Sequence, residues 1–210
     1  MGGTVRVLPS VWEPETGRCG AILQAWYPGQ AGGTAVAEVL FGDYNPAGKL
    51  PLTFYRNLAQ IPDFEDYNMT GRTYRYMKET PLFPFGHGLS YTTFKYGKLK
   101  MNDDKIAAGQ NLNLAIPVTN TGSRDGDEVV QVYLKKMDDT EGPVKTLRAF
   151  KRVRIPAGKT VEVKFSLDDT QLEWWDEQSN TMRVCPGNYT VMIGGTSCEK
   201  SLLSRAFTIR

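Results

Sequence analysis

The sequence is poor in the residues that build metal and thiol sites. Its 210 residues include a single histidine, His87, and three cysteines, Cys19, Cys185 and Cys198, with no Cys-X-X-Cys pair among them. Structural zinc sites need several closely spaced Cys and His ligands, so we expect neither a metal centre nor a bound cofactor. Cys185 and Cys198 could meet across a hairpin, but an odd number of widely spaced cysteines favours free thiols.

Long apolar runs and a strong net charge are also lacking. No apolar run approaches the roughly 20 residues that a transmembrane helix requires. The first residues lack the basic stretch and long apolar core of a secretory signal, so the chain carries no signal that assigns its location. A net charge of only +2 is too small to indicate a nucleic-acid or membrane partner. We therefore expect neither partner.

What the sequence does contain is typical of a globular protein rich in turns. Hydrophobic residues make up 40% of the chain and charged residues 23%, which is neither a disordered nor a fibrous composition. Its 21 glycines and 12 prolines favour many turns between strands. The length suits one large domain or two small ones.

From about residue 96 onward, short runs alternate apolar and polar residues. The clearest runs are 112–118, 130–134, 161–167 and 189–193. A period of two is typical of antiparallel strands with one packed and one wet face. Turn residues recur between the runs, at 120–122, 141–143, 156–158 and 186–188. This pattern predicts an immunoglobulin-like or fibronectin type III-like β-sandwich.

The earlier part of the chain has a helical signal. Residues 35–41 are compact and apolar, and Gly42 follows them as a helix-ending glycine would. Val36, Val39 and Leu40 have the spacing of one apolar helix face. We therefore expect a helix here.

The rest of the earlier part is expected to be extended or irregular. Residues 49–55 predict a short extended segment kept to a sheet edge by Pro51, and residues 56–80 predict a long, polar, Tyr-rich loop. The fold prediction is mainly β with some α, namely a partial α/β segment followed by the β-sandwich.

Two long motifs resemble a known family. Residues 25–55 begin Ala-Trp-Tyr-Pro-Gly-Gln and end Gly-Lys-Leu-Pro-Leu-Thr-Phe-Tyr, and residues 81–94 read Pro-Leu-Phe-Pro-Phe-Gly-His-Gly-Leu-Ser-Tyr-Thr-Thr-Phe. Together they resemble the end of the second, α/β sandwich domain of glycoside hydrolase family 3 enzymes, the β-glucosidases, β-xylosidases and their relatives. Residues 147–150, 156–158 and 186–189 resemble landmarks of the fibronectin type III-like domain with which many of these enzymes end.

The resemblance implies a division of the chain and a missing catalytic pair. Residues 1–95 would be the C-terminal remnant of the family 3 α/β sandwich domain with a linker loop, and residues 96–210 the fibronectin type III-like domain. The family's nucleophilic Asp and acid/base Glu would lie upstream of this chain, so no catalytic residue is assigned. The chain would then be a fragment, silent by itself, of a retaining, exo-acting glycosidase of plant-derived oligosaccharides. That parent enzyme would be periplasmic or secreted, with a cytoplasmic location as the alternative.

A short string carries subfamily information. Residues 71–75 read Gly-Arg-Thr-Tyr-Arg, which resembles β-xylosidase-like members, whereas β-glucosidase-like members more often have Gly-Tyr-Arg-Tyr. The resemblance thus implies a β-xylosidase, with β-glucosidase as the runner-up. Arg72, Tyr74 and Arg75 are the candidates for substrate binding. The arginines could help shape the sugar-binding end of the parent's active site or hold the domain junction by charge-assisted hydrogen bonds. The preferred interpretation is structural: the arginines pin the long loop through its carboxylates.

Other candidate residues have a structural interpretation that we prefer. Asp63, Glu65 and Asp66 cluster in the long loop, and a retaining glycosidase needs two carboxyl groups about 5.5 Å apart; a solvated acidic loop with turn-forming Asp explains them better. His87, between two glycines, is expected to be a turn or packing residue at the domain boundary.

Two aromatic pairs and a basic run also have a structural interpretation that we prefer. The pairs Trp26-Tyr27 and Trp174-Trp175 could stack on sugar rings, but we expect the first pair to pack the helix entry and one residue of the second to be core. A basic run fits an edge strand protected by charge, with binding of an acidic polysaccharide as the alternative. Its members are Lys145, Arg148, Lys151, Arg152 and Arg154.

Two functions remain open at this point. In the first, the chain completes a family 3 glycosidase, and its uncovered apolar side chains seek the missing N-terminal catalytic portion or another copy of the chain. Those side chains are Val36, Val39, Leu40, Phe41 and Phe54. In the second, the chain is a non-catalytic β-sandwich module that binds a plant cell-wall oligosaccharide or a partner protein.

Overall fold

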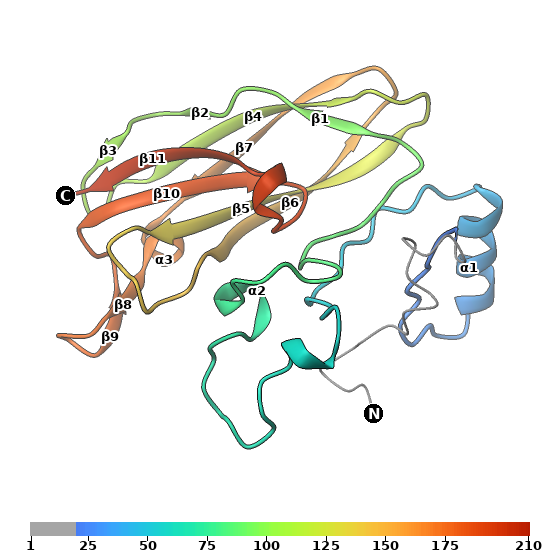
Figure 1. Cartoon of the computed structure of the whole chain (residues 1–210). Coiled ribbons are helices and arrows are strands. Elements are labelled where there is room, and N and C mark those ends of the chain that lie inside the picture. Colours follow the sequence, from blue (N-terminus) through green and yellow to red (C-terminus); the bar gives the residue numbers. More distant parts are fainter. Residues whose placement is uncertain (1–19) are drawn as a thin grey trace.

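The computed structural model describes residues 20–210, and Cys19 lies outside the described residues. Strands dominate from Phe94 onward, while the preceding part is irregular with short helices (Figure 1). Those helices are α1 (Gly32–Phe41), η3 (Leu58–Gln60) and α2 (Thr73–Tyr76). The prediction of a mainly β fold with some α is confirmed. No helix of the described part is both long and apolar enough to cross a membrane.

The strands form two sheets that face each other. In the first sheet, the long central strand pairs with one strand on one edge and with two short strands on the other; these are β4 (Leu112–Asn120), β7 (Thr160–Leu167), β1 (Phe94–Tyr96) and β2 (Lys100–Met101). The second sheet has the order β3 (Lys105–Ile106), β11 (Leu203–Ile209), β10 (Gly187–Gly194), β5 (Gly126–Lys136) and β6 (Thr146–Ile155). Only β3 and β11 pair in parallel within the described sheets.

The core lies between the sheets and follows the predicted alternation. The inward side chains of β4, β5, β7 and β10 are buried, among them Ile116, Val132, Phe165 and Ile193. Burial of branched apolar side chains on facing sheets is the main stabilising contribution in such a sandwich. At one end of the core, α3 (Asp169–Leu172) leads into a hairpin of β8 (Trp174–Asp176) and β9 (Thr181–Arg183), and η4 (Glu199–Ser201) connects β10 to β11.

The predicted wet face is wrong for the centre of the second sheet. On β5, Gln131 and Tyr133 point away from the core, yet they are only 3% and 0% exposed, and the paired Met192 of β10 is also buried. The reason is that residues 74–87 cover this face, as their hydrogen bonds and ring contacts with the sheet show. β7, by contrast, keeps the expected alternation of exposed and buried residues.

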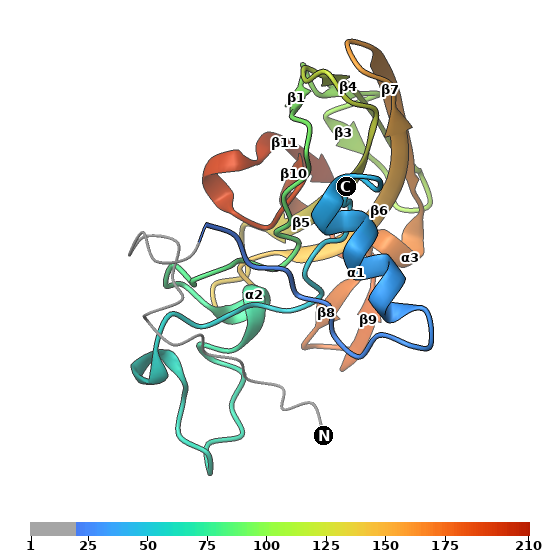
Figure 2. The same cartoon turned by 90° about the vertical axis from the view of Figure 1, so that its right-hand side faces the viewer.

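The helix α1 ends before Gly42 as predicted but begins at Gly32, ahead of the predicted run 35–41, and nothing in the described part covers its outer side. Gly42 ends it in the left-handed region at φ +83°, with its N–H bonded to Val39 O. Leu40 and Phe41 are 65% and 84% exposed. Figure 2 shows α1 outside the sheets, where Tyr91 and Arg124 bond backbone carbonyls at its end.

The predicted strand over residues 49–55 is reduced to a single bridge. Phe54 pairs with Phe83, and Leu50 exchanges backbone hydrogen bonds with Gly86 and His87. Pro51 interrupts the ladder because it has no N–H to donate. The segments 50–54 and 83–87 therefore run side by side without forming a regular sheet.

Candidate functional site

The three acidic residues of the long loop form turns rather than a facing pair of acids. Asp63 accepts a hydrogen bond from the N–H of Glu65, and Asp66 accepts bonds from the backbone and side chain of Asn68. The backbone N–H of Asn68, followed by its side chain, holds the pKa of Asp66 below its ordinary value. A general acid of a glycosidase needs a raised pKa. The geometry supports the turn-forming interpretation.

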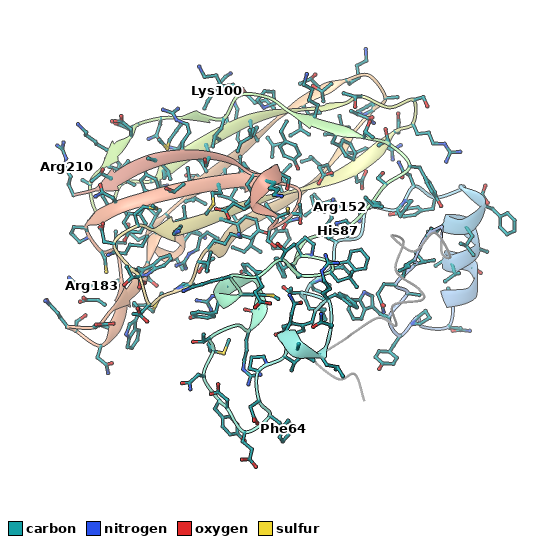
Figure 3. The ribbon with its side chains drawn as sticks, in the orientation of Figure 1. Phe64, His87, Lys100, Arg152, Arg183 and Arg210 are labelled. Atoms are coloured by element: carbon teal, nitrogen blue, oxygen red, sulfur yellow. The ribbon has the colours of Figure 1, made fainter. Side chains whose placement is uncertain are left out.

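Arg72 braces the same loop. Its guanidinium donates to the backbone carbonyls of Asn68 (Nε to O, 2.9 Å), Asp63 (3.2 Å) and Asp66. The loop is thus pinned, as the structural interpretation expects, but through backbone carbonyls instead of the carboxylates. Beyond this brace, the side chain of Phe64 projects at the loop tip, away from the sandwich (Figure 3).

Tyr74 and Arg75 lie elsewhere, against the sandwich. The Tyr74 ring stacks on Phe85 with ring centroids 4.3 Å apart and meets Tyr133 edge-on at 5.8 Å. Its hydroxyl accepts a hydrogen bond from the N–H of Leu147, 3.1 Å away, on β6. The structure therefore places Tyr74 and Arg75 at the junction of the two regions and leaves Arg72 in the loop.

The motif over residues 84–88 is fitted closely to the sandwich. Gly86 has φ +77°, and a Cβ there would fall 2.1 Å from Gln131 Oε1. At Gly88 a Cβ would fall 2.2 Å from the carbonyl oxygen of Gly48. Both glycines are thus required by close approach, and Phe85 O accepts a hydrogen bond from the N–H of Ser197.

His87 has the packing role expected of it. Its ring stacks on Phe83, with centroids 5.2 Å apart, and its carbonyl accepts a hydrogen bond from the N–H of Leu50. Burial, followed by the nearby charge of Lys49, lowers the pKa of the imidazole. His87 lies between the two regions of the molecule (Figure 3).

Sequence reasoning missed the polar residues that hold this junction. Lys49 Nζ pairs with Glu128 Oε1 at 3.2 Å, with only 15% and 7% of the two side chains exposed, and also donates to Gly88 O. Gln131 Nε2 donates to Gly195 O (2.7 Å) and Gly86 O (3.3 Å).

Such buried charge-assisted and amide hydrogen bonds fix relative orientation. Burial, and then the charge of Glu128, raises the pKa of the nearby Tyr96 hydroxyl. No sequence pattern marks these residues, because both partners of each contact are far apart along the chain.

The aromatic pairs separate into core and surface. Trp174 is 3% exposed and donates its Nε1–H to Asp139, whereas Trp175 is 50% exposed, so the prediction of one core residue is confirmed. Tyr27 is 72% exposed, and its expected packing at the helix entry is wrong. Pro28 occupies that place, since a Cβ on Gly32 would fall 2.3 Å from Pro28 Cβ.

Except for Lys145, which precedes it, the basic run lies on β6, an edge strand of its sheet as predicted. Arg152 pairs with Asp127 of β5 at 2.7 Å, and Arg154 pairs with Asp125, just before β5, at 3.3 Å. Lys145, however, is only 8% exposed, and burial lowers the pKa of its ammonium. The run is thus not a uniformly exposed charged strip.

The two described cysteines and a hollow on the surface do not form a pair of facing acids either. Cys185 and Cys198 carry free thiols, and burial raises the pKa of Cys185. Within residues 20–210, no three metal-binding side chains lie together. A shallow hollow of about 490 Å³ is lined by residues 97–99 and 203–205, none of which has a carboxylate.

Family models match both regions of the chain. Residues 3–91 match the glycosyl hydrolase family 3 C-terminal domain, and residues 128–197 match the fibronectin type III-like domain.

Curated relatives extend the match over nearly the whole chain. A xylan 1,4-β-xylosidase of Xylanibacter ruminicola is 53% identical over 94% of this chain and 22% of that protein. A periplasmic β-glucosidase of Salmonella typhimurium is 38% identical over 85% of this chain and 25% of that protein.

Solved structures agree in fold. A β-glucosidase of Erythrobacter marinus superposes with a TM-score of 0.79 at 38% identity, over 93% of this chain and 26% of the other. The chain spans about a quarter of the length of the proteins it matches. It belongs to glycoside hydrolase family 3 and corresponds to the C-terminal portion of the family's β-xylosidases and β-glucosidases.

Proposed function

We propose that this chain forms the C-terminal part of a retaining, exo-acting β-xylosidase that acts on plant-derived oligosaccharides, with a β-glucosidase as the next choice. The observation that carries the choice of sugar is the 53% identity to a xylan 1,4-β-xylosidase, together with the string Gly71-Arg72-Thr73-Tyr74-Arg75. Identity to the β-glucosidases is lower, at 38% for the Salmonella protein.

The role proposed for the chain within such an enzyme is structural. The family 3 segment and the sandwich meet through the Lys49–Glu128 ion pair, the Gln131 hydrogen bonds and the Tyr74–Phe85 stack. A junction of buried ionic, amide and aromatic contacts sets one relative orientation of the two regions. The chain would thereby hold the sandwich in a fixed place beside a catalytic part that supplies the nucleophilic Asp and the acid/base Glu.

The proposed partner is that catalytic portion, or a second copy of this chain in its absence. Large apolar side chains of the family 3 segment are exposed, including Leu40 at 65% and Phe41 at 84% on α1. Contiguous apolar surface of this kind favours association. We expect the isolated chain to self-associate through α1 and its surroundings.

The test is prolonged hydrolysis of aryl β-xyloside, β-glucoside and α-arabinofuranoside by the purified chain, alone and mixed with the preceding portion of a family 3 β-xylosidase. We expect no release by the chain alone and release of xylose in the mixture. Release by the chain alone that disappears on Asp63→Asn or Asp66→Asn would contradict the proposal, and Glu162→Gln, on the far sheet, serves as the control.

One observation favours carbohydrate binding as a second function. The half-exposed Trp175 sits opposite Met182 on the β8–β9 hairpin, and an exposed aromatic face suits the CH-rich face of a sugar. Calorimetric titration with xylan, cellulose and arabinoxylan tests it. Saturable binding that is lost in Trp175→Ala would support this function, and flat traces would eliminate it.

A further inference from the structure

The N-terminal end of β6 contains an unusual concentration of buried polar atoms without partners. Within residues 20–210, five buried side-chain N or O atoms have no hydrogen-bond partner, and three of them belong to Arg75, Thr146 and Arg148. Native interiors leave few such atoms, and each calls for an explanation. The two arginines come from different regions of the molecule, since Arg75 belongs to α2 of the family 3 segment and Arg148 to the sandwich.

Backbone contacts bring these two arginines together. Arg75 O accepts a hydrogen bond from the N–H of Val144 at 2.6 Å, and the neighbouring Tyr74 hydroxyl accepts one from Leu147, the residue before Arg148. Figure 1 shows α2 below the sandwich on the side of β5 and β6. The positive charge of Arg75, after burial itself, lowers the pKa of Arg148. The backbone contacts thus bring the segments that carry the two arginines together, and both side chains are partly buried there.

The charge of Glu173 acts on Arg148, but neither guanidinium is held by a carboxylate at ion-pair distance. Within the described residues, neither Arg75 nor Arg148 forms an ion pair. Arg148 donates Nη2–H to the Glu173 carbonyl at 2.6 Å and lies over the Trp174 ring, 5.3 Å from its centroid. Arg75 lies over the Tyr76 ring at 5.5 Å. These contacts hold the two side chains in place but leave the Nε–H of each unbonded.

The carboxylate of the neighbouring turn is already committed to other partners. Asp139 accepts hydrogen bonds from Trp174 Nε1 and from the N–H of Gly142. Its two oxygens therefore orient the Trp174 ring and the preceding turn. The Nε–H groups of Arg75 and Arg148 remain without an acceptor in the described part of the chain.

We propose that Arg75 and Arg148 form a binding site for a small oxyanion, which bridges α2 and β6. A guanidinium presents Nε–H and Nη–H as a planar fork that matches two oxygens of a carboxylate, sulfate or phosphate. An oxyanion between the two arginines accepts hydrogen bonds from their unbonded Nε–H groups. Its negative charge also reduces the repulsion between the two positive charges. The proposal of this site does not depend on the proposed function.

The experiment follows the Arg Nε–Hε and backbone amide resonances of the whole chain while sulfate, phosphate or acetate is added, with chloride at matched ionic strength. We expect saturable shifts of the Arg75 and Arg148 Nε–Hε signals and of the Leu147 amide. A response to sulfate and phosphate alone identifies a free inorganic oxyanion as the ligand, and an equal response to acetate identifies a carboxylate group. Saturation only at concentrations where chloride gives the same shifts would overturn the proposal.

Two variants test the arginines separately. Arg148→Gln and Arg75→Gln should each weaken sulfate binding about tenfold or more, the value of one lost charge-assisted bond. Arg154→Gln, on the same strand but 74% exposed at its side chain, should bind sulfate as the unchanged chain does. Since sulfate also stabilises proteins non-specifically by exclusion from their surface, thermal stabilisation that is equal in all three variants would contradict a specific site. If Arg148→Gln does not fold, Arg75→Gln alone decides the outcome.

Discussion

The two regions of this molecule reach their structures by different means. From residue 94 to the end, two facing sheets of four and five strands pack around a shared core that includes Ile116, Val132 and Ile193. From residue 20 to 93, α1 leaves Leu40 and Phe41 exposed, and other parts of this region pack against β5. The sandwich is therefore stabilised by its own core, whereas the preceding region depends on the junction. The following predictions test this difference.

The largest effect is expected in the sandwich core. Ile193→Ala removes a fully buried side chain, which costs about 4 kcal/mol of unfolding free energy for such large-to-small changes. Because the junction rests on this sheet, both regions should lose structure together in a denaturant titration followed by circular dichroism and by Trp fluorescence. Leu203→Ala, on a 37% exposed side chain, is the control and should change stability little.

Breaking the buried ion pair should affect mainly the junction. Glu128→Gln leaves Lys49 charged and largely buried without its partner, a change that costs about 3 kcal/mol or more in buried pairs. We expect faster proteolysis within residues 20–90 while the sandwich persists. The exposed pair of Lys100 and Glu162 provides the control, since Glu162→Gln should cost at most about 1 kcal/mol. Equal rates of proteolysis within residues 20–90 in both variants would show that the ion pair does not stabilise the junction.

Gly86→Ala should have a smaller but still clear effect. The position has φ +77° and its Cβ would collide with Gln131, so the change combines backbone strain of about 1–3 kcal/mol with a displaced hydrogen bond. The measurement is the protection of the Ser197 amide, which bonds to Phe85 O. Gly158→Ala has a similar φ of +69° but open space around its Cβ, and should leave that amide protected.

The smallest prediction concerns pH. Burial lowers the pKa of His87 in the folded chain, so the unfolded chain binds more protons than the folded one when the pH falls through the unfolded value near 6.5. Stability from the neutral imidazole is therefore present above this pH and is lost below it. Melting temperatures are compared at about pH 7.5 and about pH 5.5, on either side of the reference pKa of histidine. The difference between the two should be smaller in His87→Asn than in the unchanged chain. An identical difference would show that His87 does not contribute.

The sandwich could be predicted from sequence because its signal is local. The alternation at 112–118 and 161–167 fixes which side chains face inward, and the structure pairs these runs directly as β4 and β7. The helix before Gly42 was predictable for the same reason, since its cap geometry depends on one glycine. Local patterns thus specify strands, helix and turns.

The junction could not be predicted because its contacts join distant residues. Gln131 and Tyr133 stand at positions that alternation assigns to solvent, and only the cover by residues 74–87 makes them buried. The pairing of Lys49 with Glu128 spans the two regions and leaves no local trace. For the candidate site, the family resemblance pointed to Arg72, Tyr74 and Arg75, but the different positions of Arg72 and Tyr74 followed only from their contacts.

Amide hydrogen exchange of the whole chain at low concentration tests the central claim most directly. The account predicts strong protection in β4, β5 and β10, intermediate protection at the amides of Leu147, Ser197 and Gly86 that form the junction, and weak protection in α1. Raising the concentration should increase protection in α1 alone if that helix mediates association. Protection of α1 as strong as that of β5 at low concentration would contradict the claim that the two regions are stabilised differently.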